Sequence, residues 1–151
     1  MILAALSDTP YRIFFLLHIV SVVAAFAPMV VHPVLAARAK ADGEGTLRTV
    51  AGYMAANGRQ IHMPSLVLVG LFGIGLILTS DDVWAFDQTW VSLAFLVWIA
   101  LCGVVSGLLM PAERKLAAGE LEAEKKVALG GQIVTVLFLV MLYLMIWKPG
   151  L

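Results

Sequence analysis

Residues 11–37 read YRIFFLLHIVSVVAAFAPMVVHPVLAA, and no charged side chain lies between Arg12 and Arg38. A membrane-spanning helix needs about 20 consecutive apolar residues, so this stretch predicts one. The same stretch contains His18 in its interior and His32 near its far end. Ionisable side chains inside hydrocarbon are costly and indicate function by default. Both histidines are therefore candidate site residues.

Three further apolar stretches lie outside this one, at about 61–80, 88–110 and 129–147. The chain is 62% hydrophobic and 13% charged, which is far from the balance of a soluble domain. Residues 1–9 have no basic region of the kind that precedes a cleaved signal, so the first span is expected to be retained. We predict an all-α membrane protein, a four-transmembrane-helix bundle formed by residues 1–151 as a single domain.

The loops predict an orientation. Eight of the ten Lys and Arg residues lie in the linkers 38–60 and 111–128, whereas the 81–87 loop has three Asp and no base. The positive-inside rule places the basic linkers in the cytoplasm, and both termini then lie outside. Tyr11, Trp84, Trp90 and Trp147 are expected to form an outer aromatic belt. The membrane is predicted to be the bacterial inner membrane.

Both basic linkers have helical features. Apolar residues recur at helical spacing from Leu47 to Met54, and Asn57-Gly58 then gives a stop signal. This pattern predicts a short interfacial helix on the inner surface. Residues 112–127 are rich in Glu, Lys and Ala, which predicts a helical extension and a turn in water. We expect its charges to form a solvated face.

Several functions are excluded by composition. The net charge is zero, so nucleic acid is not an expected partner. The lone Cys102 excludes an internal disulfide and a CxxC motif. The chain has no phosphate-binding glycine loop, no G-x-S-x-G and no HExxH. A nucleophilic hydrolase is therefore not indicated, and the sequence leaves open whether the protein is an enzyme.

His18 is predicted to lie roughly 12 Å into the membrane from Pro10, in the outer half. No other histidine lies at that depth. Partners expected on the last span are Met141, Tyr143 and Met145, and a His/Met pair is a known haem ligation. The alternative is an interhelical hydrogen bond, for example to Ser92 or Thr135.

His32 and His62 are predicted to lie at the same level near the inner boundary. They are expected to meet either as two axial ligands or in a metal site with Met63 nearby. The alternative is that both are hydrated interfacial histidines, since polar side chains reach the interface readily.

Glycines mark the second and third spans at Gly70, Gly73, Gly75, Gly103 and Gly107. Small residues let helix backbones approach closely, so tight packing is the first interpretation. Room for a flat ligand between helices and a homodimer through the glycine-rich faces are the alternatives. Membrane lipid is the other expected partner.

Four motifs carry a resemblance to a known family. They are Leu17-His18, Arg59-x-x-His62-x-Pro64, the run Met110-Pro111-Ala112-Glu113-Arg114-Lys115-Leu116, and Tyr143-Leu144-Met145-x-x-Lys148-Pro149. Over nearly its whole length the chain resembles an uncharacterised bacterial family of predicted four-helix integral membrane proteins. It is similar, more distantly, to HemJ-type protoporphyrinogen oxidases and to CopD-type copper-resistance membrane proteins.

The HemJ-type resemblance implies that the chain binds haem b and that His18 is a haem ligand. Pro33, Pro64 and Lys148-Pro149 also match that plan. HemJ-type enzymes have a functional lysine in the third span, whereas residues 88–110 contain no Lys or Arg. We therefore expect haem binding with a redox or electron-transfer role rather than protoporphyrinogen oxidation. The alternative is a haem-free protein, namely a copper-handling component, a small carrier or a structural subunit.

Overall fold

The computed structural model describes residues 8–150, and every regular element in that range is helical. The elements are α2 (Thr9–Ala41), α3 (Glu44–Asn57), α4 (Met63–Leu78), α5 (Thr89–Val104), α6 (Met110–Ala117) and α7 (Ala123–Trp147). Two short π-helical segments, η1 (Gly58–His62) and η2 (Val105–Leu109), join α3 to α4 and α5 to α6. The described chain thus has four long helices that are apolar enough to cross a membrane, as predicted.

Each long helix extends beyond its predicted span. The first runs from Thr9 to Ala41, about 50 Å at 1.5 Å per residue, whereas the hydrocarbon core of a bilayer is about 30 Å thick. Pro28 and Pro33 lie inside this helix and do not end it, although each lacks the N–H that a helix interior uses. The predicted helical extension after the third span is confirmed as α6, followed by a turn before α7.

The expected helix stop at Asn57-Gly58 is wrong. Gly58 has right-handed helical dihedrals, so α3 continues through η1 into α4. The widened turn comes directly before Met63-Pro64, and η2 likewise comes directly before Met110-Pro111. A proline ring crowds the preceding turn of an α-helix and removes one of its hydrogen bonds. A π-helical turn at that point lets each helix continue past its proline.

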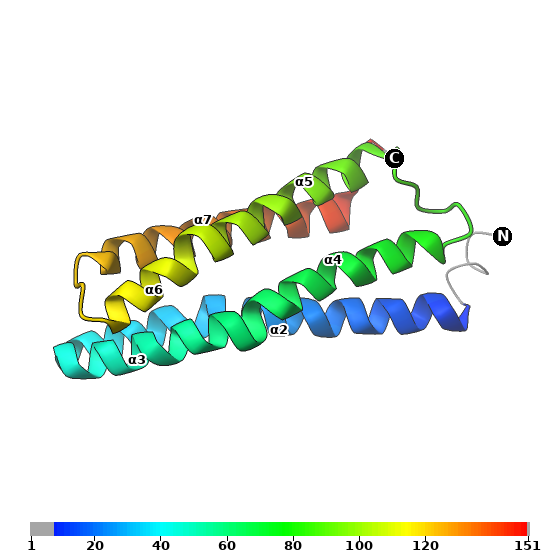
Figure 1. The fold of residues 1–151 in the computed structure, drawn as a ribbon. Helices are drawn as coiled ribbons and strands as arrows, with labels where there is room; N and C mark the ends of the chain where they lie inside the picture. The colour runs from blue at the N-terminus through cyan, green and yellow to red at the C-terminus, as the bar shows by residue number, and fades with distance from the viewer. Residues whose placement is uncertain (1–7, 151) are drawn as a thin grey trace.

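The helices form two antiparallel pairs (Figure 1). The first helix, α2, packs along α3 and α4, while α5 and α6 pack along α7. The two pairs lie close together at the end where α3 and α6 meet and diverge toward the 79–88 loop (Figure 1). The buried core includes Leu66 and Leu101, which line the space that this divergence opens, and Val105 and Val134, which do not. This divergence positions the site described below.

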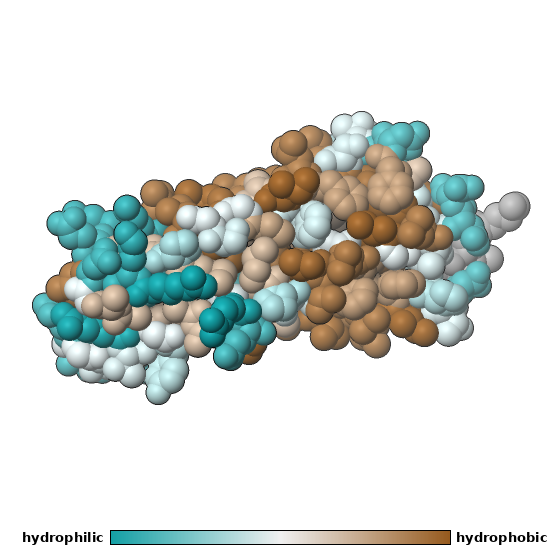
Figure 2. Space-filling view, viewed as in Figure 1, coloured by the Kyte–Doolittle hydropathy of each residue, from teal (hydrophilic) through white to brown (hydrophobic). Residues whose placement is uncertain are grey.

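The surface is divided along the long axis (Figure 2). Hydrophilic side chains cover the end formed by α3, α6 and the 118–122 turn, and apolar side chains cover most of the remainder of the face in view (Figure 2). The eight Lys and Arg residues of the two linkers all lie on the elements of that hydrophilic end or next to them. Tyr11, Trp84 and Trp90 meet at the opposite end, where the indole N–H of Trp84 donates to the Tyr11 hydroxyl at 3.1 Å.

Candidate functional site

An apolar cavity of about 290 Å³ lies between the two helix pairs at their diverging end. This volume is at the lower end of the range typical of small-molecule sites. All four long helices contribute to its wall, which extends from Tyr11 to Phe26 along α2, roughly 20 Å of helix. The rings of Phe26 and Phe138 stack at 4.2 Å between centroids and close the inner end. No acidic side chain lines the cavity among the described residues.

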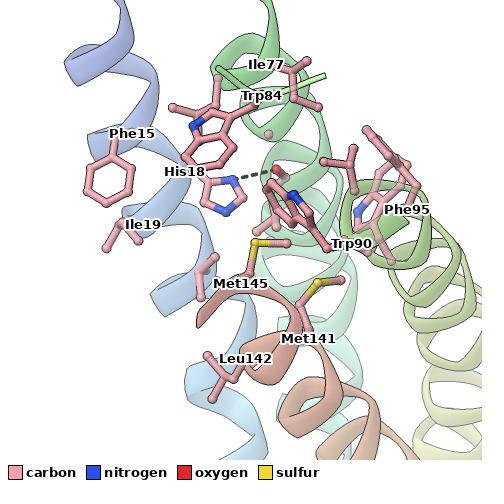
Figure 3. A pocket seen from close by; sticks show the side chains of 18 of the residues that line it. Phe15, His18, Ile19, Ile77, Trp84, Trp90, Phe95, Met141, Leu142 and Met145 are labelled. Carbon is pink, nitrogen blue, oxygen red and sulfur yellow. Dashed lines mark hydrogen bonds between the residues drawn. The ribbon is translucent and has the colours of Figure 1, made fainter. Parts of the chain in front are cut away.

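His18 projects from α2 into this cavity (Figure 3). Its Nδ1 lies 3.0 Å from the carbonyl oxygen of Val69 on α4. A carbonyl oxygen only accepts hydrogen bonds, so Nδ1 is the donor and carries the proton. In the neutral ring Nε2 then keeps its lone pair, and this is the arrangement of most metal-binding histidines. Ser92 and Thr135, the partners expected in the alternative interpretation, bond instead to backbone carbonyls of their own segments.

Met141 and Met145 line the same cavity from α7 (Figure 3). Residues four apart lie on one helix face, so both thioethers point toward the space that His18 faces. Tyr143, the third expected partner, lies on another face of α7, where it is half-exposed and stacks on Trp147 at 5.3 Å. The cavity thus brings together one imidazole and two soft sulfur atoms.

The glycines of α4 have different roles. A methyl group at Gly70 would lie 2.3 Å from the Trp98 ring, and one at Gly75 would lie 2.4 Å from the Phe14 ring. These two glycines serve close aromatic packing, as first interpreted. Gly73 lines the cavity, and a methyl group there would only touch the His18 ring at 3.6 Å. A methyl group at Gly103 or Gly107 would meet nothing within 4 Å in the described chain, so the homodimer face stays a prediction.

The end of the cavity formed by Trp84, Trp90 and Lys148, called here its outer mouth, is aromatic and carries one formal charge. Trp84 and Trp90 pack edge to face at 5.5 Å between ring centroids. Lys148 lies after the last turn of α7, with its Nζ 5.0 Å from the Trp84 ring centre and 5.8 Å from that of Trp90. In the sequence, Lys148 is part of the motif Tyr143-Leu144-Met145-x-x-Lys148-Pro149, which did not predict a place for it in a site. No apolar or charge pattern predicts that a terminal lysine turns back over a cavity.

A second polar cluster lies at the hydrophilic end of the bundle. His32 Nε2 is 3.2 Å from the amide nitrogen of Asn57, and His32 Nδ1 is 3.6 Å from a carboxylate oxygen of Glu113. The Glu113 side chain is 2% exposed. His62 is also buried, and its Nε2 has no hydrogen-bond partner among the described residues. This cluster is separate from the cavity, which neither His32 nor His62 lines.

Histidine, cysteine and carboxylate side chains of the described chain do not form a three-ligand group at the metal site expected around His32, His62 and Met63. Residues 8–150 contain no set of three or more His, Cys, Asp or Glu side chains placed to hold one ion. The two ring nitrogens of His32 instead lie next to the side chains of Asn57 and Glu113. Met63 packs against the apolar core.

The expectation that the charges of residues 112–127 form a solvated face is wrong for Glu113. Because η2 carries the helix onward, Glu113 falls on the same face as Leu109 and Leu116, which are both buried. Their four- and three-residue offsets are the helical repeat of a core face. That spacing in the sequence could have predicted the burial of Glu113. The neighbouring Lys and Glu residues instead favoured a solvated face.

Comparison with family models, with curated proteins and with solved structures found no match for this chain.

Proposed function

We propose that this protein binds haem b in the membrane and has a redox or electron-transfer role. The proposal is supported chiefly by one observation: the Nδ1–H of His18 is held by the Val69 carbonyl while its other ring nitrogen faces an apolar cavity. A histidine oriented in this way is ready to coordinate a metal through Nε2.

The cavity residues fit such a group. His18 would supply a nitrogen ligand and Met141 or Met145 a thioether ligand, as in haem proteins with His/Met ligation. The surrounding indole and phenyl rings offer flat apolar walls that exclude water. When bound, haem iron supplies one-electron redox chemistry. The chain holds the ring of His18 in one orientation and keeps the site dry.

The proposal includes the orientation of the helix bundle in the membrane. We place the hydrophilic end, with α3 and α6, at the cytoplasmic surface of a bacterial inner membrane, because that end collects eight of the ten basic residues. The cavity then lies in the outer half, and α3 lies at the inner surface as an extension of α4. Both termini face outward. An electron partner at the outer face has the shorter path to the site.

The first test is an optical spectrum of the detergent-purified protein, oxidised and then reduced with dithionite, together with pyridine haemochrome quantification. We expect a Soret band and sharp reduced α and β bands at about one haem per chain. The His18→Ala variant should lose that spectrum because it removes the only imidazole that lines the cavity among residues 8–150.

His32→Gln is the matched control, since it removes a second histidine from the same helix without touching the cavity. It should retain full haem content. An unchanged spectrum in His18→Ala would contradict only the assignment of His18 as the ligand. A colourless protein after expression with ample haem would contradict the haem proposal itself. Metal analysis after copper loading would then test the haem-free alternative.

A further inference from the structure

The two ends of the cavity differ in charge. Apart from His18, its inner and middle walls are apolar or aromatic, and among residues 8–150 only Lys148, at the outer mouth, adds a formally charged side chain to the wall. No Asp or Glu side chain of residues 8–150 pairs with Lys148 within ion-pair distance. A ligand that matched this wall would be apolar over most of its body and negatively charged at one end.

The backbone at Lys148 is held in an unfavourable conformation. Its φ of 44° and ψ of 61° place it in the left-handed region, which costs a residue with a Cβ atom roughly 1–2 kcal/mol. Glycine is the usual residue at this point of a helix end. The Lys148 N–H closes the helix on the Leu144 carbonyl at 3.0 Å. A lysine kept in a glycine conformation suggests a use for its side chain.

Both indole donors beside Lys148 are already engaged, which leaves the ammonium group as the charged donor for a ligand, with the Tyr11 hydroxyl as a neutral donor beside it. Trp84 donates its indole N–H to Tyr11, and Trp90 donates to Gln88. The Lys148 ammonium lies over the two indole rings, a contact that holds the cation without using its N–H groups as hydrogen-bond donors to an anion. It is half-buried, and a charge-assisted hydrogen bond is stronger there than in water.

We propose that Lys148 binds the anionic group of the cavity ligand, a flat apolar molecule bearing carboxylates at one edge, with those carboxylates at the outer mouth. This inference rests on the proposed function and refines it, because the propionates of haem are such groups. Tyr11 lies at the level of Trp84, and His18 is seven residues further along α2, about 10 Å deeper. The ring body would thus lie at the level of His18, and its charged edge would lie at the level of Trp84 and Trp90, where Lys148 lies.

Two probes that share one ring and differ in the charge of its two carboxyl groups, which are methylated in one of them, test this. Haem-free protein in nanodiscs is titrated with haemin and with haemin dimethyl ester, following quenching of Trp84, Trp90 and Trp98, which all line the cavity. Wild-type protein should bind haemin at least about tenfold more tightly than the diester, since hydrogen bonds to charged groups contribute that much. Lys148→Gln should remove the difference and leave diester affinity unchanged, and Lys148→Arg should retain most of it.

Lys126→Gln is the control, because Lys126 is an exposed lysine of the same helix at its other end. Equal affinity of wild-type protein for both probes, or equal weakening of both by Lys148→Gln, would overturn the Lys148 assignment. If a His18-dependent Soret shift persisted in that case, the proposed function would stand. If the probes were discriminated but the Soret band did not depend on His18, the haem-ligand assignment alone would fail. No binding of either probe would overturn both.

Discussion

At the scale of single residues, the lack of a side chain at Gly70 allows α4 and α5 to pack closely. Gly70 lies against the Trp98 ring, and the Trp98 indole N–H donates to the Leu66 carbonyl at 2.8 Å. Trp98 can reach that carbonyl only because nothing projects from Gly70. The ring edge also forms part of the cavity wall, so the same glycine serves both packing and the site.

Gly70→Ala should therefore destabilise the protein by about 1–3 kcal/mol, the usual cost of overpacking a filled interior. The measurement is the midpoint of thermal unfolding in detergent, followed by circular dichroism. Gly103→Ala is the control, because a methyl group there meets nothing within 4 Å and alanine favours a helix by up to about 1 kcal/mol. A midpoint for Gly70→Ala as high as that of Gly103→Ala would contradict the packing role.

At the scale of elements, the two π-helical turns connect the long apolar helices to their polar extensions. Each lets its helix pass a proline without ending, so that α3 and α6 pack against one another beyond the apolar band. The continuation places Glu113 opposite His32 on α2. A buried carboxylate needs a partner, and the other ion pairs of the described chain lie on the surface.

Removal of one member of this buried pair should be costly. His32→Ala should lower the free energy of unfolding by about 3–5 kcal/mol, because Glu113 would stay buried without its partner. The double variant His32→Leu, Glu113→Leu should recover most of that loss. The measurement is the free energy of unfolding of wild-type protein and of both variants, obtained with denaturant in mixed micelles.

The exposed pair Lys115–Glu120 is the control for the buried one, with side chains that are 55% and 60% exposed. Glu120→Ala should cost no more than about 1 kcal/mol. A similar small loss in His32→Ala would show that the Glu113 carboxylate does not depend on His32.

At the scale of the whole molecule, the separation of charged from apolar surface along the bundle axis (Figure 2) leads to a topology prediction. The single native cysteine makes the test direct. In a Cys102→Ala background, Asp82→Cys lies in the loop at the cavity end and Glu122→Cys lies in the turn at the hydrophilic end. An impermeant maleimide should label the first in intact spheroplasts and the second only after permeabilisation. The reverse pattern would invert the proposed orientation.

The four spans and the collection of basic residues at one end followed from local properties of the sequence. In lipid each helix satisfies its own backbone hydrogen bonds, so about 20 apolar residues in a row suffice to predict a spanning helix without knowledge of its neighbours. The same reasoning identified His18 as a residue that needs explanation, because it lies far from either end of the apolar stretch.

The partners of these side chains were decided by the tertiary structure. His18 bonds to a carbonyl 51 residues away, Lys148 turns back over two indole rings, and Glu113 is buried against His32. Each contact depends on the packing angle between helix pairs and on the rotation of each helix about its axis. Those quantities arise from the fit of many side chains at once, and no local spacing in the sequence contains them.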